Sequence, residues 1–206
     1  MKEKTPLSVL DRPNSYIGKS NPRAGARQLL EGRGVFVDDL NLPRMLHVVF
    51  CRSPYAHAKI VSINTERAAS ESGVVRVVTG AELVDYCSPW VGVLTHLQGL
   101  KSASQHAIAV DRACWQGEAI CAVLAETRAQ AEDAAALVQI EYEELPVVVD
   151  METALDETTP LIHPELGDNL CFQREVNFGE VDKAFTDAHT VIEETFHFGR
   201  HTGVCL

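Results

Sequence analysis

The chain has 206 residues, 46% of them hydrophobic, and its 18 Lys and Arg against 29 Asp and Glu give a formal net charge of −11. Such a length holds one sizeable domain, or one domain and part of another, and the hydrophobic content is that of a folded globular protein. The acidic balance, with no cluster of Lys and Arg, argues against nucleic-acid binding, because the surface would repel a phosphate backbone.

The sequence lacks the features of membrane, secreted and metal-ribbon proteins. No apolar run reaches the roughly 18 residues that a membrane span needs, and the charged start at residues 1–6 lacks the apolar segment of a signal peptide. We therefore expect a cytoplasmic protein. The six cysteines are scattered without a C-x-x-C spacing, so we expect reduced, buried thiols rather than zinc or iron–sulfur ligands.

The first half of the chain predicts an extended N-terminal segment, residues 1–25, followed by short alternating elements. The patterns indicate strands at 35–37, 45–51, 59–64 and 74–78 and helices at 66–71 and 79–86. Because residues 45–51 are nearly all apolar, we expect that strand to be covered on both faces. The alternating pattern at 59–64 predicts a half-exposed strand.

A strand–helix–strand unit is the clearest prediction in the second half. It follows an irregular segment, residues 87–107, which is long enough to suggest a functional or interface loop. Residues 118–125 read as a buried strand, and Thr127 with Gln130 forms a capping box that starts the next helix. A stripe of small residues should let this helix approach the sheet closely, and the returning strand begins at Val138.

The pattern of apolar and polar residues changes near residue 155, where we place a domain boundary. A connector with two prolines leads to a short amphipathic helix at 181–188 and to a strand at 190–198. Ile192, Phe196 and Phe198 would share one face of that strand. Because nothing after it closes the fold, we expect the chain to be a piece of a longer polypeptide.

Two histidine-containing segments could suggest metal sites. His197 and His201 are four residues apart, but on a strand this spacing separates them by about 13 Å, too far for one ion. The cluster of His163, Glu165 and Asp168 is equally well explained as a polar connector. The acidic runs at 141–144 and 193–194 are most simply exposed strand edges, and no glycine-rich nucleotide loop occurs. We therefore assign no catalytic, cofactor-binding or metal-binding residue.

Several stretches, in order along residues 20–206, resemble the N-terminal part of the large, molybdopterin-binding subunit of the xanthine dehydrogenase and aldehyde oxidase family, which includes aerobic carbon monoxide dehydrogenase. The stretches are Gly32-Arg33-Gly34, Val37-Asp38-Asp39-Leu40, Arg52-Ser53-Pro54-Tyr55-Ala56-His57-Ala58, Glu141-Tyr142-Glu143, Leu161-Ile162-His163-Pro164 and Gly179-Glu180-Val181-Asp182. The resemblance implies an α+β fold: an α/β-hammerhead domain at 26–155, then a linker and the incomplete start of a molybdopterin-binding domain at 156–206.

The resemblance also implies an oxidoreductase whose chemistry lies elsewhere. In this family a molybdopterin cofactor hydroxylates a carbon or oxidises carbon monoxide, and electrons leave through [2Fe–2S] clusters to FAD on partner domains or subunits. We expect no cofactor in this segment, association with those partners and an oligomeric enzyme. The segment would have a structural and subunit-docking role; the alternatives are a stand-alone, non-catalytic hammerhead module for protein interaction and an unrelated α+β domain.

Overall fold

The computed structural model describes residues 16, 18–92, 94 and 96–199. In chain order the elements are α1 (Ala26–Leu30), a 3₁₀ helix (Val37–Asp39), β1 (His47–Arg52), β2 (Ala58–Asn64), α2 (Glu66–Ala69), β3 (Val74–Thr79), α3 (Gly80–Leu83), β4 (Arg112–Ala113), β5 (Ala119–Ala125), α4 (Arg128–Ala135), β6 (Gln139–Glu144), a 3₁₀ helix (Pro164–Leu166) and α5 (Val181–Asp187). The predicted α+β fold class is confirmed. None of the described helices is both long and apolar enough to cross a membrane.

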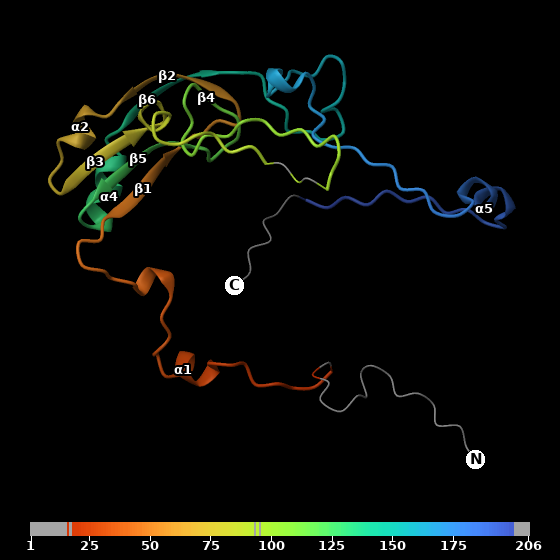
Figure 1. The fold of residues 1–206 in the computed structure, drawn as a ribbon, viewed down its shortest axis with the longest axis horizontal. Coiled ribbons are helices and arrows are strands. Elements are labelled where there is room, and N and C mark those ends of the chain that lie inside the picture. Colours follow the sequence, from red (N-terminus) through yellow and green to blue (C-terminus); the bar gives the residue numbers. More distant parts are fainter. Residues whose placement is uncertain (1–15, 17, 93, 95, 200–206) are drawn as a thin grey trace.

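The strands form two small antiparallel sheets, in the orders β1-β5-β3 and β4-β2-β6. Figure 1 shows α4 against the β1-β5-β3 sheet, with β2 and β6 on the other side of the body. The segment that carries α1 and the segment that carries α5 both leave this body, and neither helix has a buried residue.

Strand β5 is the centre of the first sheet and contributes to two hydrophobic clusters. On one face, Val123 packs with Ala68 of α2 and Ala134 of α4. On the opposite face, Ile120 packs with Ala109 and Ala113 and with apolar residues of β2 and β6. Because side chains alternate between the faces of a strand, one short strand joins both layers.

The strand–helix–strand unit is confirmed, with one change at its cap. Thr127 Oγ1 accepts from the backbone N–H of Gln130 at 3.3 Å, but the Thr127 hydroxyl also donates to Gln130 Oε1 at 2.8 Å. The reciprocal hydrogen bond of a capping box, in which the Thr127 backbone N–H donates to Gln130 Oε1, is therefore replaced by this side-chain pair. The predicted stripe of small residues is confirmed at its centre, where Ala131 and Ala134 are fully buried.

Three predicted strand features are wrong. Residues 35–37 form no strand: a 3₁₀ helix begins at Val37 and runs to Asp39, and Asp39 Oδ2 accepts from the Phe36 N–H at 3.0 Å. Strand β1 is covered on one face only, since Val48 and Phe50 are 47% and 43% exposed. Residues 190–198 are exposed and form no strand, because no neighbouring strand in the described part of the chain pairs with them.

A larger side chain at Ala134 should disturb the contact between α4 and β5. We expect Ala134→Leu to lower the free energy of unfolding by about 1–3 kcal/mol, because the buried site has no room for extra methylenes. Ala129→Leu is the matched control: it makes the same change on the exposed side of α4 and should shift stability by less than about 0.5 kcal/mol. Urea unfolding measures both. Equal effects would contradict close packing at Ala134.

Candidate functional site

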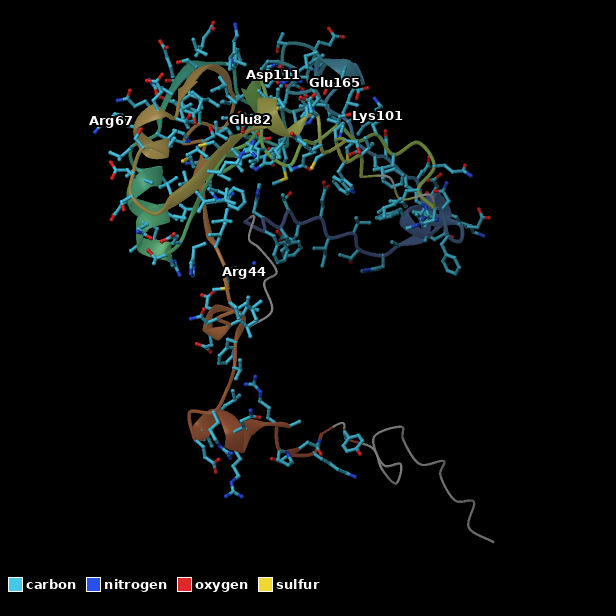
Figure 2. The ribbon with its side chains drawn as sticks, turned by 60° about the vertical axis from the view of Figure 1, so that its left-hand side comes forward. Arg44, Arg67, Glu82, Lys101, Asp111 and Glu165 are labelled. Carbon is cyan, nitrogen blue, oxygen red and sulfur yellow. The ribbon has the colours of Figure 1, made fainter. Side chains whose placement is uncertain are left out.

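A hollow of about 570 Å³ lies where the loop at 87–107, the segment around β4 and the connector at 163–171 meet. It combines aromatic with charged side chains, among them Trp90, Trp115, Lys101 and Arg112. Figure 2 labels Lys101, Asp111 and Glu165 in this part of the molecule. The loop is held across its base by a pair of backbone hydrogen bonds between Trp90 and Gln105, each 2.8 Å long.

Lys101 attaches the loop to the connector at three points. Its Nζ is 2.6 Å from Asp168 Oδ1 and 3.4 Å from the carbonyl oxygen of Leu166, and its backbone N–H donates to the carbonyl of Cys171 at 2.8 Å. The Lys101 ammonium lowers the pKa of Asp168 below its ordinary value. The loop and the connector are thus joined by main-chain and charged contacts together.

Arg112 of β4 makes a second attachment. Its Nη2 is 3.2 Å from Glu165 Oε2, and His163 Nδ1 is 3.4 Å from the other oxygen of the same carboxylate. The pKa of Glu165 is lowered, first by a hydrogen bond from its own backbone N–H and then by Arg112. The cluster singled out in the sequence is therefore divided: His163 and Glu165 meet, whereas Asp168 pairs with Lys101.

Glu118 is a buried carboxyl group in the wall of the hollow. It is 8% exposed and accepts from the backbone N–H of Cys114 at 2.6 Å. Burial raises its pKa above the ordinary value of 4.5, against the effect of that hydrogen bond. Burial also raises the pKa of the Cys114 thiol. The sequence pattern places Glu118 only at the start of a buried strand, and that position is the one signal of its burial.

The charged pairs of the hollow join its walls to one another. Both cations of the hollow are already paired with carboxylates, and no group of three or more His, Cys, Asp and Glu that could hold a metal ion occurs among the described residues. His197 lies 3.7 Å from Glu152, while His201 falls outside the described residues. The exposed acidic edge is confirmed for β6 at 141–144; Glu193 and Glu194 are exposed but belong to no strand.

The fold is that of a hammerhead domain, and the comparisons with known proteins identify its family. Residues 31–146 match the family described as "Aldehyde oxidase and xanthine dehydrogenase, a/b hammerhead domain". Because this match covers more than half of the chain, the protein belongs to the aldehyde oxidase and xanthine dehydrogenase family. The predicted resemblance and the hammerhead fold are confirmed.

Individual relatives agree with this assignment. The chain is 37% identical over 199 residues to the nicotine 6-hydroxylase large subunit of Paenarthrobacter nicotinovorans, covering 93% of this chain and 24% of the relative. It is similar to the crystal structure of quinoline 2-oxidoreductase from Pseudomonas putida 86, with a TM-score of 0.63 and 42% identity over 68% of this chain and 18% of that chain. A Cu,Mo-CO dehydrogenase structure gives a TM-score of 0.66 at 29% identity, over 84% and 23% of the two chains. The chain thus spans about a quarter of the length of the nicotine 6-hydroxylase large subunit.

Removing the two connector carboxylates should loosen the hollow. We expect Glu165→Gln with Asp168→Asn to speed amide hydrogen exchange across 163–171 by roughly two- to fivefold, because exposed ion pairs stabilise by at most about 1 kcal/mol. Glu132→Gln is the control, since it breaks the exposed Arg128–Glu132 pair on α4 and should leave the connector unchanged. Exchange that is identical in the double variant and the wild type would show that the backbone bonds hold the connector without the charges.

Glu118 should impose a pH dependence on folding. Because its pKa is raised in the fold, the folded protein binds its proton more tightly than the unfolded chain, so this contribution to stability is present below pH 4.5 and is lost as the pH rises. We expect Glu118→Gln, whose amide oxygen can still accept from Cys114, to flatten the fall in stability above that pH. The control is Glu126→Gln at an exposed carboxylate, which should keep the wild-type slope. A steeper fall in the Glu118 variant would contradict the assignment.

Proposed function

We propose that this chain is the N-terminal part of the large subunit of a molybdenum-containing hydroxylase or dehydrogenase of the aldehyde-, xanthine- or carbon monoxide-oxidising type. The hammerhead match, together with relatives that are large subunits about four times as long, supports this proposal. Residues 26–155 would be the hammerhead domain, and 156–206 the linker and the start of the molybdopterin-binding domain. Its cytoplasmic location stays a prediction.

The role proposed for this segment is structural and subunit-docking rather than catalytic. What supports this role is that the cations Lys101 and Arg112 are already paired with carboxylates, so we assign neither of them to a cofactor. Cofactor chemistry would then belong to the remainder of the parent subunit, with [2Fe–2S] clusters and FAD on partner domains or subunits. A domain without ligands can still position such parts.

The observation that carries the docking role is the exposed apolar surface of residues 176–198. Phe178, Ile192, Phe196 and Phe198 are each at least 80% exposed, and α5 next to them buries no residue. Large apolar side chains gathered on one segment are typical of an interaction surface. In the parent subunit this surface would be covered by the chain that follows and by partner subunits.

The source gene provides the direct test. We expect the reading frame to continue beyond codon 206 for several hundred codons, and the purified product to carry molybdenum and to associate with iron–sulfur and FAD subunits. A stop codon directly after Leu206, with a stable monomeric product, would overturn the enzymatic proposal. The chain would then be a stand-alone hammerhead module for protein interaction.

Without partners, the 206-residue chain should self-associate through its exposed segment. We expect the apparent mass in light scattering to rise with concentration, and the triple variant Ile192→Ser, Phe196→Ser, Phe198→Ser to reduce that rise, because it removes three of the four apolar side chains of the segment that are at least 80% exposed. The control Tyr86→Ser alters an isolated exposed aromatic residue and should leave association unchanged. A monomer with uniform hydrogen-exchange protection through 190–198 would contradict the prediction.

A further inference from the structure

Two cysteines occupy directly opposite positions on neighbouring strands. Cys51 of β1 and Cys121 of β5 are register partners in the antiparallel pairing of the first sheet. Opposite residues of an antiparallel pair have Cα atoms about 4.5–5.5 Å apart, within the roughly 4.4–6.8 Å that disulfides span. The backbone therefore already holds the two positions at a separation that a disulfide can bridge.

Because directly opposite residues of an antiparallel pair project from the same face of the sheet, the side chains of this pair point the same way. The Cys51 thiol donates a hydrogen bond to the carbonyl oxygen of Ala135 in α4 at 3.6 Å. Both sulfurs therefore lie between the sheet and α4. Their opposite positions on one face place the two sulfurs next to each other without a rearrangement of the backbone.

The two thiols differ in access to solvent. Cys121 is fully buried because β5 is the central strand, whereas Cys51 is partly exposed because β1 is the edge of the sheet. The register also shifts directly after Cys51, where a bulge interrupts the ladder. A bulge locally disrupts pairing and bends the strand. A small reagent would therefore reach Cys51 first.

We propose that Cys51 and Cys121 form an oxidation site that hydroperoxides convert reversibly into an intramolecular disulfide. The Cys51 thiolate attacks one oxygen of the peroxide O–O bond, which breaks to leave Cys51 as a sulfenic acid and releases water or an alcohol. The Cys121 sulfur then attacks the Cys51 sulfur, an S–S bond forms, and the S–O bond breaks to release water. Two thiols lose two electrons and two protons, and one peroxide is reduced.

The electrostatics of the pair agree with these roles. The neighbouring Cys121 thiol lowers the pKa of Cys51, and the same pairing raises the pKa of Cys121. The more accessible sulfur is thus the one more readily ionised, and thiolate character together with access governs oxidation. The oxidation site does not depend on the docking role proposed above.

The test is a titration of the full-length protein, as expressed from its own gene, with hydrogen peroxide. After free thiols are blocked with N-ethylmaleimide, peptide mass spectrometry should find the peptides of Cys51 and Cys121 joined, with the mass of two hydrogen atoms lost and with restoration by dithiothreitol. The oxidised protein should also melt several degrees higher, because the cross-link restricts the unfolded chain.

Variants distinguish the formation of this disulfide from a general oxidation of exposed thiols. Cys51→Ala and Cys121→Ala should each abolish the linked peptide, while Cys87→Ala, at an exposed cysteine, should leave it at the wild-type yield. The wild-type measurement stands on its own if either core variant fails to fold. Peroxide that oxidises Cys87 and Cys171 while Cys51 and Cys121 still react with N-ethylmaleimide on denaturation would overturn the proposal, as would sulfinic acid at Cys51 without a cross-link.

Discussion

The pairing of β5 with strands on both sides is the constraint on which the rest of the structure depends. Its register places Val123 opposite Val49 of β1 and Val77 of β3, so one row of valines crosses the sheet under α4. The alternate residue Ile120 extends into the second cluster, between β5 and the sheet built on β2. No strand of one sheet is a hydrogen-bonded neighbour of a strand of the other sheet. The two sheets are joined instead by the apolar side chains that β5 buries at both of its faces, and each Å² of apolar surface buried stabilises the fold by about 25 cal/mol.

The hollow depends on weaker contacts than the sheets do. Its walls come from segments far apart in the sequence: Lys101 meets Asp168 across 67 positions, and Arg112 meets Glu165 across 53. Each pair is substantially exposed, so solvent screens its attraction. The buried strands are the more stable part of the structure, whereas the loop and the connector can separate from each other at a small cost in free energy. Such a difference in local stability is common where a surface must accept a partner.

Local patterns predicted the elements whose own residues decide them. The buried strand at 118–125, the cap at Thr127 and the small-residue stripe of α4 all follow from periodicity and capping chemistry. Features that need a distant partner were missed: β4 has only Arg112 and Ala113, and the ion pairs of the hollow join residues that no short-range rule connects. The apolar run at 45–51 suggested two covered faces, yet one face of β1 is open. Residues 190–198 carry a strand pattern without a strand beside them.

The strand order also determines how the chain can acquire its fold during synthesis. Strands β1 and β3 leave the ribosome first, but they lie on opposite sides of β5 and cannot pair with each other in the native arrangement. Until residue 125 has emerged, both valine-rich strands lack their native neighbour, and such unpaired strand edges are prone to mispairing and aggregation. Pairing of β1 with β5 needs contacts across 67 positions (Arg52 with Ala119) to 78 positions (His47 with Ala125), and such non-local pairing is slow. The nascent hammerhead is therefore most vulnerable before β5 appears, a period in which a chaperone would have its greatest effect.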